Sequence, residues 1–199
     1  MSEDSEQELD WIHMPPGSEV ESLWDCLHDG ELVSSHSDLI NRAVSLEFIV
    51  HHLQEEPDDN LRFFLHLKNV QSVRANVTFR WPGEFIVPEG ASRDEELRMG
   101  KEYQAKWREE SIGWLSFEGS LSTDPLLISD AEFARSNGML ALKISGSLDG
   151  ERFNDLYCSI FLRGTSISAS RSDGEPFTLE QFIEMGRRYW EKYSQRNEG

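Results

Sequence analysis

The sequence predicts an α+β protein: a mostly antiparallel β-sheet with helices packed on it, built from a strands-then-helix unit that occurs twice. Several short runs alternate apolar and polar residues, which is typical of half-buried antiparallel strands. Two longer stretches, about 92–112 and from 178 onward, space their apolar residues as amphipathic helices do. Strands and helix follow in the same order in both halves of the chain, which indicates an internal duplication.

The two predicted long helices correspond to each other residue by residue. Both begin with a capping box, in which a hydroxyl residue is followed three positions later by an acid or an amide. A glycine inside a helix costs about 1 kcal/mol relative to alanine, so a glycine shared by both predicts close backbone approach to a sheet or another helix. The matched residues are Ser92, Glu95, Met99, Gly100, Lys101, Tyr103, Lys106 and Trp107 against Thr178, Gln181, Met185, Gly186, Arg187, Tyr189, Lys192 and Tyr193.

The first half is assigned from local patterns. Residues 1–17 are acidic and polar, and are predicted to be a disordered tail. Ser18 and Glu21 form a capping box for a short helix over about 19–27. A polar loop is expected from Gln54 to Asn60, and a linker over 84–91. The predicted strands of this half cover 32–39, 44–50, 61–67, 70–73 and 77–79.

The second half repeats this plan, with predicted strands at 126–128, 140–144, 156–162 and 167–169 before the final helix. Phe177 and Phe182 flank the cap of that helix as a hydrophobic staple.

The strands of the two halves also correspond, as the pairs Leu65 with Ile160 and Leu67 with Leu162 illustrate. We therefore predict one α+β domain over 18–199, made of repeats at about 18–114 and 115–199. Chance similarity between two amphipathic helices is the alternative.

The charge of the chain is strongly acidic and unevenly distributed. Nineteen basic and 37 acidic residues give a net charge of −18. Most of the excess of acidic over basic residues lies in residues 1–99. Such a surface repels nucleic acid and anionic membranes and attracts basic partners. Solubility alone is the other explanation for the acidity.

The sequence indicates a cytoplasmic protein. No apolar run approaches the roughly 20 residues needed to span a bilayer, and the acidic N-terminus does not resemble a secretory or transit signal. Cys26 and Cys158 are far apart and are expected to be free thiols in a reducing compartment, with Cys158 buried on the apolar face of a strand.

Catalytic signatures are scarce, which argues against an enzyme and for no cofactor. We find no nucleophile elbow, P-loop or glycine-rich dinucleotide turn, and no zinc-ligand spacing. An adjacent His-Asp pair, as at His28 and Asp29, provides ligands in one class of metal phosphohydrolases, but that class is all-helical, so a helix end followed by a turn into a strand is the favoured explanation. His66 lies at a strand position facing away from the apolar residues. These three residues form the alternative metal site.

The predicted partner-binding residues are Trp81, Glu84, Glu89 and Glu31. Trp81 precedes Pro82 in the longer strand-to-helix loop of the first half, and it belongs to neither predicted core. An aromatic side chain in acidic surroundings is suited to anchoring an interface. Covering a sheet edge is the other role open to it.

Residues 24–70 resemble one group of bacterial immunity proteins that neutralise polymorphic toxins. Those proteins are short β-rich domains that open with a tryptophan, then a His-Asp pair, a small residue and an acid, and continue into a strand. The chain is longer than they are, and its second strand-and-helix unit departs from them. A larger bacterial domain family with the same strand entry is the alternative. The matching residues are Trp24, His28, Asp29, Gly30, Glu31 and Leu32.

Two functional interpretations follow. The resemblance implies a non-catalytic protein that binds a toxin, and the acidity favours a basic partner, since many toxins are basic nucleases. The alternative is a small-ligand or metal-binding protein, or a hydrolase, with a cleft between the two repeats that uses His28, Asp29 and His66. The sequence does not indicate an oligomeric state.

Overall fold

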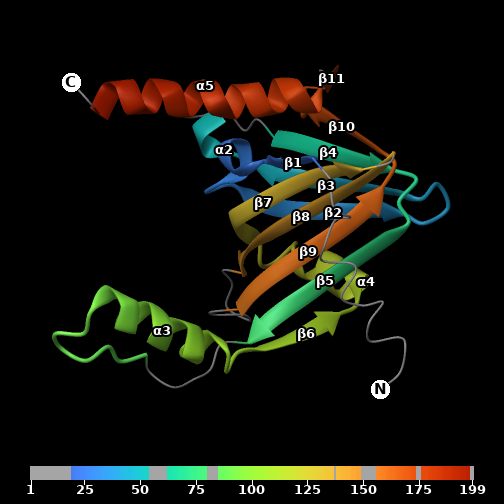
Figure 1. Cartoon of the computed structure of the whole chain (residues 1–199). Coiled ribbons are helices and arrows are strands. Elements are labelled where there is room, and N and C mark those ends of the chain that lie inside the picture. The colour runs from blue at the N-terminus through green and yellow to red at the C-terminus, as the bar shows by residue number, and fades with distance from the viewer. Residues whose placement is uncertain are drawn as a thin grey trace.

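The computed structural model describes residues 19–53, 62–79, 85–136, 138–148, 156–173 and 176–197 (Figure 1). The predicted acidic tail and the predicted loop from Gln54 to Asn60 lie outside these residues. Within the described residues the fold is α+β: an eleven-stranded sheet in which every pairing is antiparallel, together with four α-helices.

The strands follow the predicted alternation closely. Most have one apolar face, which is buried, and one polar face. Their bounds are β1 (Glu19–Ser22), β2 (Glu31–Asp38), β3 (Ala43–Ile49), β4 (Arg62–Lys68), β5 (Ser72–Phe79), β6 (Arg108–Ile112), β7 (Leu126–Ser136), β8 (Met139–Leu148), β9 (Leu156–Gly164), β10 (Ser166–Arg171) and β11 (Pro176–Phe177).

The helices differ in length and in how they contact the sheet. Two short helices precede the central strands of the sheet. A helix of intermediate length precedes β6, and a long helix follows β11. Their bounds are α2 (Trp24–Leu27), α3 (Arg93–Gln104), α4 (Trp114–Ser120) and α5 (Leu179–Asn197), and a 3-10 turn covers His51–Leu53.

The order of strands across the sheet is β11-β10-β4-β3-β2-β7-β8-β9-β5-β6, and β1 pairs with β7 beside this path. The two meanders, β2-β3-β4 and β7-β8-β9, therefore lie side by side. The pairing of β2 with β7 joins them at the centre of the sheet. The next strand of the first meander, β5, joins β9 of the second. In the same way β10, which follows β9 along the chain, joins β4 of the first.

The two central strands, β2 and β7, are related in their register. Glu31 pairs with Leu127 and Leu32 pairs with Leu126. The ladder of β2 with β3 shifts after Leu32, and the ladder of β7 with β8 shifts after Ile128. Each meander thus has an irregularity, of the kind a β-bulge produces, early in its first strand.

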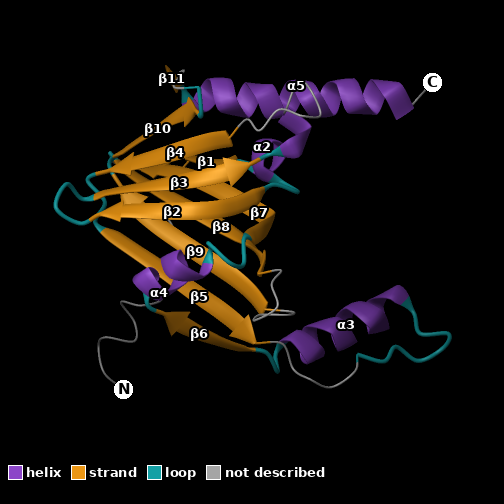
Figure 2. Ribbon diagram, turned by 180° about the vertical axis from the view of Figure 1, so that it is seen from behind, coloured by secondary structure: helices purple, strands orange, loops and turns teal. Residues whose placement is uncertain are grey.

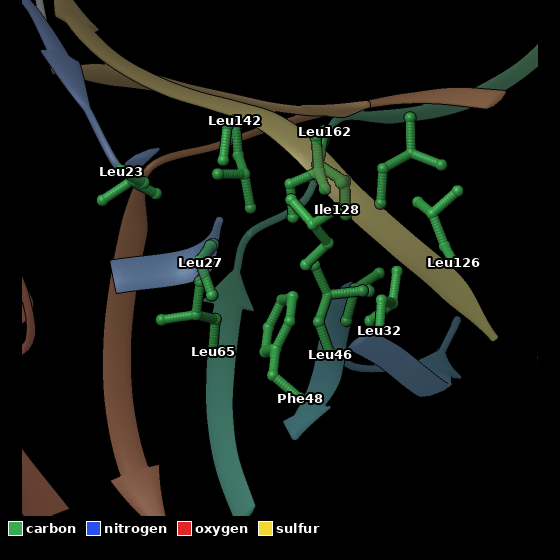
Figure 3. Packing of buried hydrophobic residues seen from close by; sticks show 14 of the residues in the cluster. Leu23, Leu27, Leu32, Leu46, Phe48, Leu65, Leu126, Ile128, Leu142 and Leu162 are labelled. Atoms are coloured by element: carbon green, nitrogen blue, oxygen red, sulfur yellow. The ribbon is translucent and has the colours of Figure 1, made fainter. Parts of the chain in front are cut away.

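The hydrophobic core lies on one face of this sheet and includes residues of both meanders. Figure 3 shows side chains from β2, β3 and β4 pointing toward those from β7, β8 and β9 and toward α2. Burial of this apolar area is the main stabilising term of the fold. The residues labelled there are Leu23, Leu27, Leu32, Leu46, Phe48, Leu65, Leu126, Ile128, Leu142 and Leu162.

The sheet curves around the short helices. α4 contacts both β2 and β5, although β7, β8 and β9 separate those strands in the sheet. Trp114 and Phe117 of α4 are buried there, and the indole Nε1 of Trp114 donates a hydrogen bond to Ser37 Oγ at 2.7 Å. α2 contacts β7 and α5.

The start of α5 confirms its predicted cap and staple. Thr178 N donates to Gln181 Oε1 at 2.8 Å, and Gln181 N donates to Thr178 Oγ1 at 3.1 Å. The rings of Phe177 and Phe182 lie 5.8 Å apart, and Phe63 of β4 packs against both. These contacts fix the N-terminal half of α5 to the sheet.

Two predicted helices are wrong in extent. The segment predicted as a helix over about 19–27 contains β1, whose backbone pairs with β7, and only the four-residue α2 is helical. The helix predicted over about 92–112 ends at Gln104, because residues 108–112 form β6 and pair with β5. Trp114, just beyond the predicted helix, begins the separate short helix α4.

Candidate functional site

The predicted partner-binding residues are dispersed over the chain. Trp81 and Glu84 lie outside the residues that the structure describes. Glu89 is exposed in the segment that leads into α3. Glu31 is half-buried at the start of β2, with its Oε1 4.0 Å from His51 Nε2. The structure therefore places Glu31 in the centre of the sheet and Glu89 in the segment joined to its β5-β6 edge.

The segment around Glu89 continues into a helix that stands away from the sheet. Both views show α3 beyond the ends of β5 and β6 (Figures 1 and 2). We call residues 85–104 the arm. Its helix begins with the predicted capping box: Ser92 Oγ accepts from Glu95 N, and Glu95 Oε2 accepts from Ser92 N. These bonds satisfy donors that a helix N-terminus otherwise leaves to water.

The arm exposes a group of large apolar side chains. No residue of α3 is buried. Phe85, Ile86 and Leu97 are 43%, 68% and 57% exposed. The ring of Phe85 lies 5.3 Å from that of Tyr103, so the segment before the helix folds back along it. Large apolar side chains exposed along one short segment make it a candidate surface for another molecule to cover.

The charges of the arm are arranged along the helix axis. Asp94, Glu95 and Glu96 occupy the first turn of α3, where the helix dipole favours negative charge. Arg93 precedes these acids, and further along the helix Arg98 pairs with Glu102 at 3.2 Å while Lys101 lies in the last turn. The acidic side chains of the helix therefore gather in its first turn.

The two matched glycines have different environments. A Cβ on Gly186 of α5 would lie 2.5 Å from the carbonyl oxygen of Asp25 and 2.7 Å from Cys26 N, so α5 and the backbone of α2 are in close contact. This confirms the prediction for Gly186. A Cβ on Gly100 would meet only Phe85 Cζ, at 3.9 Å, so the prediction of close backbone approach is wrong for α3.

His28 and Asp29 lie where α2 turns into β2. His28 Nδ1 is 3.1 Å from Asp29 Oδ2, and the imidazole packs on the Trp24 ring at 4.2 Å, with Trp190 of α5 at 6.3 Å. Asp29 has a φ of 59°, as expected for a residue that ends a helix in a turn. The pair occupies an aromatic junction between two helices.

His66 lies on the polar face of β4, between two serines. Its Nδ1 is 2.8 Å from Ser45 Oγ, and its Nε2 is 2.9 Å from Ser170 Oγ. Burial, with a smaller effect from the charge of Lys68, lowers the pKa of His66. Within the described ranges, no group of three or more His, Cys, Asp or Glu side chains is arranged to hold a metal ion, so His66 does not join His28 and Asp29 in such a group.

Both cysteines are buried thiols. Cys158 lies on the apolar face of β9, as predicted, and Cys26 Sγ donates to the carbonyl of Leu23 at 3.3 Å. Burial raises the pKa of each thiol to about 12. A thiol with such a pKa is a poor nucleophile at neutral pH.

An open hollow of about 340 Å³ lies between β10, β11 and the N-terminal half of α5. Its charged side chains are already engaged: Arg171 pairs with Asp173, and Arg188 pairs with Glu184 at 2.8 Å. The proposed ligands His28, Asp29 and His66 do not line it. It therefore differs from the cleft between repeats that the alternative interpretation requires.

The exposure of Phe85, Ile86 and Leu97 was not predicted from the sequence. Leu97 and Tyr103 are at helical spacing, which does not distinguish a packed helix face from an exposed one. The composition of α3 carried a signal, since seven of its twelve residues, Arg-Asp-Glu-Glu-Leu-Arg-Met-Gly-Lys-Glu-Tyr-Gln, are charged. A helix with so few apolar residues has little to bury in a core.

Comparisons with known proteins gave no match to a protein-family model, a curated protein or a solved structure. Within the described residues, no helix is both long enough and apolar enough to cross a membrane.

Proposed function

We propose that this chain is a non-catalytic, cytoplasmic interaction protein that binds a basic protein through the arm. The observation that carries the proposal is the state of α3, a twelve-residue helix with no buried side chain and exposed apolar groups beside it. Isolated helices of about 12–15 residues are marginally stable in water, and packing of an apolar face usually stabilises them. A partner that covers Phe85, Ile86 and Leu97 would supply that packing.

Electrostatics supports a basic partner. The arm carries Glu89 ahead of the acidic first turn of α3. The chain as a whole has a net charge of −18. Complementary charge raises association rates more than it raises final affinity, so the acidic surface is suited to fast capture of a positively charged protein. Trp81 and Glu84, next to the arm in sequence, are part of the proposed site.

The resemblance of residues 24–70 to immunity proteins supports a toxin as the class of partner. Many toxins of that kind are basic nucleases, and an immunity protein must bind its toxin quickly and without catalysis. Glu31, which belongs to the resembling stretch, lies at the centre of the sheet and remains a secondary contact in this proposal.

We also infer that the two halves of the domain are repeats, at about 18–114 and 115–199. Support comes from the topology, in which each half contributes a short helix, a three-stranded meander, a strand added to the other meander, and a later helix. Further support comes from the central ladder. Shifting each residue by 95 positions exchanges the pair Glu31–Leu127 with the pair Leu32–Leu126.

Affinity capture with matched variants tests the function. The tagged chain is incubated with lysate of its source cells, and retained proteins are identified after low-salt and high-salt washes. We expect the wild-type chain to retain a basic protein that high salt releases. Leu97→Glu should release it at low salt, because the change places a charge in the apolar contact. Ile40→Glu is the control, since Ile40 is 93% exposed in the β2–β3 turn, outside the arm.

The retained protein is then purified, and its affinity for each variant is measured by calorimetry. At least a tenfold loss for Leu97→Glu, with no loss for Ile40→Glu, supports the arm as the binding site. Equal affinity for both variants, or a retained protein that is not basic, contradicts the proposal.

A further inference from the structure

Aromatic side chains gather on the surface where α2 meets the C-terminal half of α5. The ring of Trp24 lies 4.2 Å from that of His28 and 5.4 Å from that of Trp190. The ring of Tyr193 follows at 5.7 Å from that of Trp190. Trp24 is 36% exposed and Tyr193 is 49% exposed. We call these four residues the aromatic junction, and two of its rings are accessible to a ligand.

The aromatic junction is held in place by contacts between its two helices. Trp190 Nε1 donates a hydrogen bond to the backbone carbonyl of Asp25 at 2.8 Å. One turn earlier, Gly186 brings the backbone of α5 against that of α2. A ligand therefore meets rings that are already positioned, which lowers the entropic cost of binding.

Negative charge lies beside these rings. The Asp29 side chain is 70% exposed, and its Oδ2 lies 3.1 Å from His28 Nδ1. Within the described residues that Nδ1 makes no hydrogen bond, so proximity rather than a directed bond joins the pair. The Asp29 carboxylate can therefore accept hydrogen bonds from a ligand that lies over the neighbouring rings.

The basic residues of α5 close to Trp190 in sequence are paired or face away from the junction. Arg187 and Arg188 both pair with Glu184, at 3.1 Å and 2.8 Å. Lys192 follows Trp190 by two residues, which places it on the other side of the helix, since successive residues are about 100° apart. Asp29 thus gives the junction a negative charge next to its aromatic faces.

We propose that the aromatic junction binds arginine side chains of the basic partner. A guanidinium group is planar, stacks on an aromatic face and donates paired hydrogen bonds to a carboxylate. Trp24 provides the aromatic face and Asp29 the carboxylate. The ammonium group of lysine is a compact charge with no planar face, so it fits the same site less well.

The junction lies at the end of the molecule that also carries the arm. Figures 1 and 2 show that α3 and the C-terminal half of α5 both extend past the same end of the strands. The source of the arginine, a basic protein bound to the arm, rests on the proposed function. The affinity of the junction for arginine does not depend on it.

An NMR titration of the purified, ¹⁵N-labelled full chain with blocked hexa-arginine tests the inference, and hexalysine is the control peptide. The indole resonance of Trp24 is identified by its absence in Trp24→Leu. We expect hexa-arginine to shift the indole resonances of Trp24 and Trp190. It should also bind about threefold more tightly than hexalysine, or better.

Two variants and a matched control locate the binding. Trp24→Leu keeps an apolar side chain but removes the aromatic face. Asp29→Asn removes the charge, and asparagine tolerates the φ of 59° at this position. Each should weaken hexa-arginine binding by about threefold or more. Glu132→Gln removes a carboxylate that is 48% exposed on β7, and it should leave the affinity within about twofold of wild type.

Three results would each overturn the inference. The first is equal affinity for the two peptides, and the second is a Trp24 indole resonance that hexa-arginine does not shift. The third is wild-type affinity for hexa-arginine in both Trp24→Leu and Asp29→Asn. Urea unfolding of each variant shows that it is folded before its affinity is compared.

The inference and the proposed function can fail separately. Partner binding that depends on Leu97, in a chain whose junction does not distinguish the two peptides, removes only the arginine site. Selective binding of hexa-arginine at Trp24, combined with partner binding that Leu97→Glu leaves unchanged, removes only the assignment of the arm.

Discussion

Substituting Gly186 by alanine should destabilise the fold by disturbing the contact between α5 and α2. The new Cβ would lie 2.5 Å from the carbonyl oxygen of Asp25, 2.6 Å from its carbonyl carbon and 2.7 Å from Cys26 N. These are backbone atoms of a helix that is itself fixed by the buried Leu27. Neither helix can relieve the overlap by a change of rotamer, so α5 must move away from α2.

Two opposing effects determine the size of the change. Alanine is favoured over glycine inside a helix by about 1 kcal/mol. Overpacking typically costs about 1–3 kcal/mol, and three backbone contacts at this distance place Gly186→Ala at the upper end. The displacement also strains the 2.8 Å hydrogen bond from Trp190 Nε1 to the Asp25 carbonyl. We therefore expect a net loss of about 2 kcal/mol in the free energy of unfolding.

The matched control is Gly100→Ala. Its Cβ would meet only Phe85 Cζ, at 3.9 Å, which is an ordinary contact. The helix preference of alanine then acts alone, and stability should be unchanged or raised by up to about 1 kcal/mol. Urea unfolding followed by tryptophan fluorescence measures both variants. A midpoint for Gly186→Ala at or above that of Gly100→Ala would refute the packing argument.

Three further outcomes are expected. Gly146→Ala should destabilise the chain strongly, because its Cβ would overlap the backbone carbonyl of Leu127 on the neighbouring strand β7; a midpoint within error of wild type in urea unfolding would contradict this. Stability should fall as pH drops below about 6.5, because the lowered pKa of His66 means that the unfolded chain binds a proton more readily than the folded one. His66→Gln should flatten that dependence in unfolding curves at successive pH values, and an unchanged slope would rule out His66 as its source. Cys26 and Cys158, whose pKa values burial raises to about 12, should react with a disulfide reagent only after denaturant is added; rapid labelling of the native chain would show that they are accessible.

The strands of this fold were predictable because their signal is local. In β3 and β4 the alternation of apolar and polar residues determines both the strand and its buried face, and the structure confirms both. The same holds for β8, where Leu142 and Ile144 are buried. Strand neighbours were not predictable, since alternation gives faces but not partners. The pairing of β10 with β4 joins Ser166 to Lys68, and nothing in either strand specifies it.

The helices show where pattern and packing diverge. Leu97 and Tyr103 have helical spacing, which correctly predicted α3, but spacing does not determine whether another element lies against the helix. In α5 the same spacing leads to burial, because Leu179 and Phe182 reach the sheet. For β1, the cap-like residues Ser18 and Glu21 favoured a helix, whereas pairing with β7, over a hundred residues later, makes the segment a strand. The candidate site was therefore only partly predictable. Glu89 was predicted, and it lies on the arm. The exposure of the apolar side chains beside it was not predicted, because it depends on the tertiary packing around α3, which the local sequence does not specify.

The exchange of β5 and β10 between the meanders has a consequence for how the domain holds together. β5 pairs with β9 and β10 pairs with β4, so each half of the chain completes the sheet of the other. The outer strand of each meander, β4 or β9, can pair on its far side only when the other half of the chain has formed. Long-range pairing of this kind couples the stability of the two halves, and it favours unfolding in one transition rather than repeat by repeat. The arm lies outside this coupling, since α3 contributes no buried residue. A change in the exposed side chains of α3 therefore leaves the buried contacts of the sheet in place.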